Sequence, residues 1–99
     1  MTIQLPIDPD VLAHFCTQHQ IRSLSLFGSM LKGSERPDSD IDLLVEFEPG
    51  KEPGLLGMGQ IEAELGSLLG RRVDLRTAQD LSRYFRDEVL RTAEVQYAH

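Results

Sequence analysis

Residues 40–47 constrain the fold of this chain more than any other segment. Acidic and apolar side chains alternate there in the order Asp-Ile-Asp-Leu-Leu-Val-Glu-Phe. Successive side chains of a β-strand point to opposite faces, so the segment is predicted to be a strand with one core face and one acidic face. The core face carries Ile41, Leu43, Val45 and Phe47, and the acidic face carries Asp40, Asp42, Leu44 and Glu46.

The segments before this strand are predicted from capping residues and periodicity. Asp8 is placed to cap a helix that starts at Pro9 and buries a stripe of Val11, Leu12, Phe15 and Cys16. Residues 22–27 alternate polar and apolar side chains and stop at Gly28, which is typical of a strand that enters a tight turn. Residues 30–32 are predicted to form one helical turn, and residues 33–39 a loop.

The segments after the strand follow the same logic. Met58, Ile61, Leu65, Leu68 and Leu69 lie at helical spacing, so residues 55–69 are predicted to be a helix that ends before Gly70. Residues 71–76 are predicted to be a short strand with Asp74 opposite Val73 and Leu75. A helix capped by Thr77, with Asp80 in its first turn, is expected to run to the C-terminus along Leu81, Phe85, Val89 and Ala93.

These elements predict one α/β domain that spans residues 1–99. A chain of 99 residues buries enough surface for a single sheet with a few helices. Because strands and helices alternate along the chain, we expect a small mixed sheet covered by helices, in the broad class α/β or α+β.

Charge and composition narrow the function classes. Sixteen acidic residues against ten Lys and Arg give a net charge of -6, which disfavours direct binding to nucleic acid. The sequence has neither a signal peptide nor a membrane span, so we expect a cytoplasmic protein. Cys16 is interpreted as a core residue, and His14 and His19 as solvent-exposed side chains.

Three aspartates form the candidate metal site. Asp40 and Asp42 point the same way on one strand, and carboxylates held that close persist when a divalent cation compensates their charge. Asp74 lies between apolar neighbours on another strand, so the three could converge on magnesium. The alternatives are a solvated edge strand for Asp40 and Asp42, and an ion pair of Asp74 with Arg71, Arg72 or Arg76.

Gly28 and Ser29 form a candidate phosphate site. Glycine lets phosphate oxygens approach the backbone, and N–H groups at the end of a strand can cradle an anion. Ser29 adds a hydroxyl donor, and Lys32 could add a cation. The alternatives are an ordinary Gly-Ser turn and an exposed lysine.

The spacing of these residues is similar to a known signature. Gly28-Ser29, ten intervening residues and Asp40-Ile41-Asp42 resemble the G-S-x10-D-x-D pattern of polymerase-beta-type nucleotidyltransferases. The segment 39–45 resembles the minimal bacterial and archaeal branch of that family. Val73-Asp74-Leu75 matches the position of the family's third carboxylate, and a helix from Phe85 to Tyr97 is expected to match its last helix.

The resemblance implies a fold, a reaction and a partner. It implies a polymerase-beta-like fold in which Asp40, Asp42 and Asp74 hold two Mg²⁺ ions, with Mn²⁺ as a substitute, while Gly28 and Ser29 hold the phosphates of ATP. Asp74 would help to activate the attacking group. Members of the minimal branch commonly act as antitoxins beside a HEPN-domain ribonuclease toxin, and the better understood members transfer AMP to a tyrosine of that toxin.

One departure and two alternatives accompany this resemblance. Met30 and Leu31 stand where many members carry arginine and alanine, which leaves Lys32 as the cation and bears on catalytic rate more than on nucleotide binding. The first alternative is an antitoxin that neutralises its toxin by binding alone. The second is a small-molecule nucleotidyltransferase, although the chain lacks a second domain to build such a pocket.

Overall fold

The computed structural model describes residues 5–28, 40–84 and 86–98. In this part of the chain the strands form one sheet in the order β3-β2-β1-β4. The strands are β1 (Ile21–Phe27), β2 (Ile41–Phe47), β3 (Val73–Arg76) and β4 (Glu94–Ala98). The helices are α1 (Pro9–Gln18), α2 (Leu55–Leu69), the 3-10 helix η2 (Ala78–Asp80) and α3 (Arg86–Thr92). Because β1 is antiparallel to β2 and β4, and β2 is parallel to β3, the sheet is mixed, as predicted.

The helix α1 begins where its capping residues predict. The carboxylate of Asp8 accepts a hydrogen bond of 2.8 Å from the backbone N–H of Asp10, and Pro9 occupies the first helical position. Leu12, Phe15 and Cys16 are buried. Val11 belongs to the predicted stripe but is exposed, so the core face of α1 is narrower than the sequence indicates.

The helix α2 has the predicted bounds. It ends at Gly70, whose φ of 69° lies in the left-handed region. Ile61, Leu65 and Leu69 are buried, whereas Leu68 is exposed, contrary to the predicted stripe.

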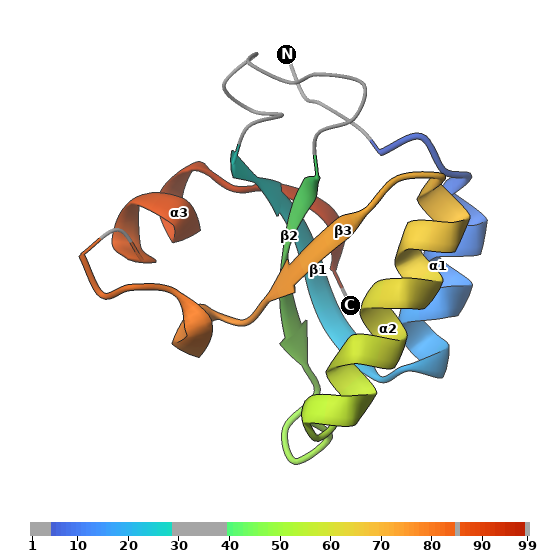
Figure 1. The fold of residues 1–99 in the computed structure, drawn as a ribbon, viewed down its shortest axis with the longest axis horizontal. Coiled ribbons are helices and arrows are strands. Elements are labelled where there is room, and N and C mark those ends of the chain that lie inside the picture. Colours follow the sequence, from blue (N-terminus) through green and yellow to red (C-terminus); the bar gives the residue numbers. More distant parts are fainter. Residues whose placement is uncertain (1–4, 29–39, 85, 99) are drawn as a thin grey trace.

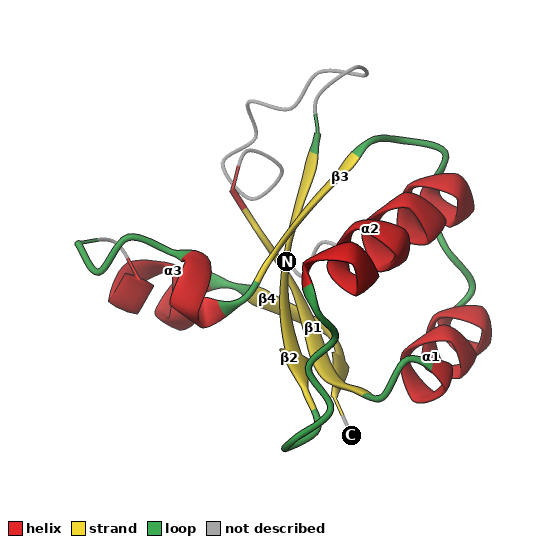
Figure 2. Cartoon of the chain, turned by 60° about the horizontal axis from the view of Figure 1, so that its bottom comes forward, coloured by secondary structure: helices red, strands yellow, loops and turns green. Residues whose placement is uncertain are grey.

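Helices α1 and α2 lie on the same side of the sheet, and α3 lies on the other (Figures 1 and 2). The ring of His19, which follows α1, contacts the carboxylate of Glu64 on α2 at 2.8 Å. The interpretation of His19 as a solvent-exposed side chain is therefore wrong, because this side chain joins the two helices that cover the sheet.

The core lies between the sheet and these two helices. The predicted core face of β2 is buried, and Leu24 and Leu26 of β1 lie in register with Val45 and Leu43. The opposite face of the two strands carries Ser23, Ser25, Asp42 and Leu44, and we call it the outer face of the sheet. The alternation in residues 40–47 is thus confirmed as one core face and one face turned away from α1 and α2.

The C-terminal region departs from the prediction of one long helix. Thr77 caps a helix and Asp80 lies in its first turn, as expected, but this helix is only η2. The chain then forms the short α3 and ends as β4, in which Tyr97 pairs with Leu24 of β1. Without β4, the second edge of β1 would expose unpaired backbone groups, so pairing across the sheet explains why residues 94–98 form a strand and do not continue the predicted helix.

Some predicted features lie outside the described residues. These are the helical turn at 30–32, the loop at 33–39, and the side chains of Ser29, Lys32 and Phe85. Within the described residues, no helix combines the length and the apolar character that crossing a membrane requires.

Candidate active site

The parallel strands β2 and β3 bring two of the predicted aspartates side by side. Asp42 is in register with Asp74, between the pairs Ile41–Val73 and Leu43–Leu75. The N–H of Ile41 donates a hydrogen bond of 2.9 Å to the carbonyl of Arg72, which fixes this register. Residues in register on parallel strands point to the same face, so both aspartates lie on the outer face of the sheet. Asp40 directly precedes β2 and, two residues from Asp42, belongs to the same face.

Gly28 adjoins these aspartates from the other side. Phe27 pairs with Asp42, and Gly28 follows with a φ of 82°. A Cβ atom on Gly28 would overlap the carboxylate of Asp42 and would lie 2.9 Å from its Cγ. Both the backbone conformation and the lack of space therefore require glycine. The predicted neighbours Ser29 and Lys32 lie outside the described residues.

Asp74 makes an ion pair on the same strand. The Nε and Nη2 atoms of Arg76 donate to the two carboxylate oxygens of Asp74 at 3.1 and 3.4 Å. The hydrogen bond to Asp74 is the main reason that the pKa of Arg76 rises above its usual range, and Asp80 and Asp42 contribute charge. The two side chains are 35% and 48% exposed, so the pair is accessible to solvent and adds little stability.

The carboxylates are not gathered into a metal-binding group. In residues 5–28, 40–84 and 86–98, no three His, Cys, Asp or Glu side chains are spaced to hold a metal ion. The backbone thus aligns Asp42 with Asp74 and places Asp40 beside them, while the Asp74 carboxylate faces Arg76. The ion-pair alternative for Asp74 therefore describes its contact in this structure.

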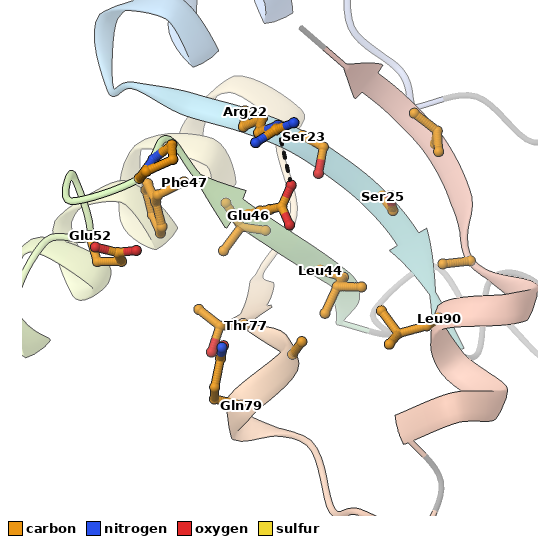
Figure 3. Close-up of a pocket in the computed structure, with 15 residues that line it drawn as sticks. Arg22, Ser23, Ser25, Leu44, Glu46, Phe47, Glu52, Thr77, Gln79 and Leu90 are labelled. Atoms are coloured by element: carbon orange, nitrogen blue, oxygen red, sulfur yellow. Dashed lines mark ion pairs between the residues drawn. The ribbon is translucent and has the colours of Figure 1, made fainter.

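A cleft on the outer face begins two residues from Asp42 along β2. It has a volume of 480 Å³, and Ser25 and Leu44, which pair across β1 and β2, lie in it (Figure 3). Leu90, Ala93 and Val95 close one side, and Thr77 and Gln79 close the other. Across its far end, Arg22 and Glu46 form an exposed ion pair of 3.7 Å.

This cleft cannot be predicted from local sequence patterns because one of its walls comes from the C-terminal region. The alternation of Ser23 and Ser25 with Leu24 and Leu26 indicates a polar face on β1. It does not reveal that α3 and β4 fold back beside that face. The alternation of Glu94, Val95, Gln96 and Tyr97 is the signal that could have located β4.

Comparison with known proteins identifies the class of this fold and site. The family model of the nucleotidyltransferase domain matches residues 10–95. The chain therefore belongs to the nucleotidyltransferase domain family, a family of enzymes. The shared fold is the polymerase-beta-like fold that the motif resemblance implies.

Two curated relatives refine this placement. The protein adenylyltransferase MntA of Thermococcus cleftensis is 42% identical over 72% of this chain and 70% of its own length. A protein of Methanocaldococcus jannaschii, provisionally named a protein adenylyltransferase, is 36% identical over 77% of this chain and 80% of its own length.

Solved structures show the same fold. A protein provisionally described as a minimal nucleotidyltransferase is 38% identical and superposes with a TM-score of 0.69 over 86% of this chain and 85% of its own. A toxin–antitoxin structure with AMP-PNP superposes with a TM-score of 0.73 at 19% identity, covering 94% and 75% of the two chains. A complex of a tri-AMPylated Shewanella oneidensis HEPN toxin with its MNT antitoxin superposes with a TM-score of 0.65 at 17% identity, covering 92% and 70%.

Proposed function

We propose that this chain is an antitoxin that transfers AMP from ATP to a tyrosine of a HEPN-domain toxin. The alignment of Asp42 with Asp74 beside Gly28 is the observation that carries the proposal. It places two carboxylates next to a turn that requires glycine. The 42% identical relative is named a protein adenylyltransferase. Complexes with HEPN toxins share the fold, which supports a partner of that kind.

Asp40, Asp42 and Asp74 suit a divalent cation by their chemistry. Carboxylate oxygens are the ligands that Mg²⁺ prefers, and Mn²⁺ accepts the same ligands. The bound ions would supply charge that stabilises the reacting phosphates. For Asp74 to become a ligand, its carboxylate must turn away from Arg76, which the exposure of that pair permits.

The phosphates and the nucleoside of ATP would lie along the outer face. Gly28 holds the turn after β1 directly against the carboxylate of Asp42, and the proposal adds Ser29 and Lys32 as a hydroxyl and a cation for the phosphates. Residues two apart on a strand are separated by about 7 Å, so the cleft at Ser25 and Leu44 lies one step from Asp42. Its volume of 480 Å³ is in the usual range for a small-molecule site.

The transfer is a single displacement at the α-phosphorus. The phenol oxygen of the tyrosine forms a bond to this phosphorus, and the bond from the phosphorus to the oxygen that bridges toward the β-phosphate breaks. Pyrophosphate leaves, and the carboxylate of Asp74 accepts the phenol proton. The AMP group adds bulk and negative charge at a site that must bind RNA, so it would exclude the substrate of the toxin.

The test is coexpression with a HEPN toxin encoded beside this chain, followed by the intact mass of the toxin. The proposal expects a mass increase of one or more AMP groups, and inhibition that persists after this chain is removed. The control is the double variant Asp40→Asn and Asp42→Asn, which should leave the toxin active and unmodified.

The ion pair of Asp74 with Arg76 favours a second candidate, an antitoxin that acts by binding alone. In that case the toxin would show no added mass. The wild-type chain and the double variant would then inhibit it equally.

A further inference from the structure

A second groove runs along the exposed edge of β3. It has a volume of 620 Å³ and lies between the N-terminal half of α2 and η2. Leu55, Met58 and Leu75 contribute its apolar surface. The groove also includes Asp74, so it adjoins the candidate active site.

Apolar side chains at this groove are exposed to an unusual degree. Leu55 is 90% exposed and Leu56, its neighbour in the first turn of α2, is 86% exposed. Only the first of these leucines lines the groove. Large apolar side chains exposed beside a concave surface are typical of binding sites, since covering them removes apolar area from water.

The charge of the groove is strongly negative. Four carboxylates line it, from Glu52, Glu62, Asp74 and Asp80, against the single cation of Arg76, which is bonded to Asp74. Backbone contacts fix two of these carboxylates. Glu62 accepts a hydrogen bond of 2.8 Å from the N–H of Leu75, and Asp80 accepts one of 3.1 Å from the N–H of Thr77. A fixed acidic rim around an apolar floor is complementary to a segment that carries both basic and apolar side chains.

The contact of Glu62 also selects the mode of binding. The N–H of Leu75 points out of the sheet edge and already donates its hydrogen bond to the carboxylate of Glu62. An incoming strand would have to displace this carboxylate to pair there. Docking through side chains, rather than extension of the sheet, is therefore the favoured mode.

We infer that this groove holds a basic, apolar segment of the acceptor protein and thereby brings the acceptor hydroxyl to Asp74. The inference rests on the proposed transfer reaction and identifies how that reaction selects its partner. A segment held against Leu55 lies beside the edge of β3, whereas the cleft at Leu44 lies over β1 and β2, and Thr77 and Gln79 line both surfaces. The acceptor and the nucleotide would thus occupy adjoining surfaces.

The test measures binding of a short fluorescein-labelled peptide in which lysine and leucine alternate around one tyrosine. Fluorescence anisotropy with the full chain, without nucleotide or metal, separates docking from transfer. Leu55→Asp should weaken binding by about tenfold, the loss expected for one central contact. Leu56→Asp is the matched control, because this leucine is equally exposed but lies outside the groove, and it should bind like the wild type.

Charge and self-association provide the contrary outcomes. A peptide with glutamate in place of lysine should not bind, and equal binding of the two peptides would refute the charge complementarity. An equal loss in both leucine variants would show that the groove does not hold the peptide.

If sedimentation shows a wild-type dimer that Leu55→Asp dissociates, the occupant is a second copy and the inference is wrong. Failure of AMP transfer with intact peptide binding would refute only the proposed reaction.

Discussion

The backbone of Gly28 lies against the carboxylate of Asp42, with no space for a Cβ atom between them. The contact joins the end of β1 to the second residue of β2. It thereby links the predicted phosphate-binding turn to the predicted metal ligands. Gly50 shares the positive φ of Gly28, at 75°, but has nothing within 4 Å of its Cβ position.

This contrast predicts different outcomes for two glycine substitutions. Gly50→Ala should lower the free energy of unfolding by about 1–2 kcal/mol, the cost of a left-handed alanine. Gly28→Ala should carry that cost and, in addition, displace Asp42, so it should also abolish metal-dependent nucleotide binding. Thermal melts and calorimetric titration with ATP and Mg²⁺ distinguish the two. Wild-type nucleotide affinity in Gly28→Ala would show that the Gly28–Asp42 contact is not part of the binding site.

Neutralising Asp40 and Asp42 should stabilise the protein in the absence of metal. Asp42 adjoins the like charge of Asp74, and Asp40 lies on the same face. Like charges on neighbouring strands cost about 0.2–1 kcal/mol, so Asp40→Asn with Asp42→Asn should raise the melting temperature. Glu46→Gln on the same face should not raise it, because Glu46 pairs with Arg22. A lower melting temperature for the double variant would reveal a structural ion pair instead.

Local signals in the sequence predict the parts of this fold that depend on short-range contacts. The alternation at 40–47 depends on which face meets the core, the end of α2 depends on Gly70, and the start of η2 depends on Thr77. Each of these is confirmed, because one strand face or one helix end contains the necessary information.

The remaining features depend on residues that are distant along the chain. The C-terminal helix was predicted from apolar spacing, but β1 offers an edge that β4 fills. The side chain of Gln96 also accepts a hydrogen bond of 3.0 Å from the N–H of Leu5, across almost the whole chain. Similarly, the sequence predicts Asp74 as a candidate ligand but does not distinguish among three arginines as its partner. Strand geometry selects Arg76, because it is two residues away on the same face.

If the nucleoside binds in the cleft on the outer face, a bulky substitution in this cleft should block its binding. Leu44→Arg places a long cation in the cleft beside Ser25, and it should weaken ATP binding by about tenfold or more. Leu68→Arg is the control, since Leu68 is exposed on α2 and lines neither cleft nor groove. Calorimetry with ATP measures both. Equal affinities for the two variants would place the nucleoside elsewhere.

Cys16 predicts a pH dependence of stability. Burial raises the pKa of its thiol from 9.0 to about 12, so the folded state holds the proton more tightly than the unfolded state. Its contribution to stability is complete below pH 9 and is lost as the pH rises toward 12. The wild type should therefore lose stability more steeply over this range than Cys16→Ala. The native thiol should also resist alkylation at pH 8, and rapid native labelling would contradict its burial.

Asp74 should be required for transfer more than for ATP binding. In the structure its carboxylate is bonded to Arg76, which lies at the same exposed strand edge. If Asp74 acts as a ligand and proton acceptor during transfer, Asp74→Asn should abolish AMP transfer and leave ATP affinity within about threefold, a difference of about 0.6 kcal/mol. Arg76→Gln separates this role from the ion pair. Because exposed ion pairs contribute about 0–1 kcal/mol, it should barely change the melting temperature, and it should strengthen Mg²⁺ binding by releasing the carboxylate. Transfer at the wild-type rate by Asp74→Asn, together with unchanged metal affinity in Arg76→Gln, would leave Asp74 as a surface ion pair with no part in the reaction.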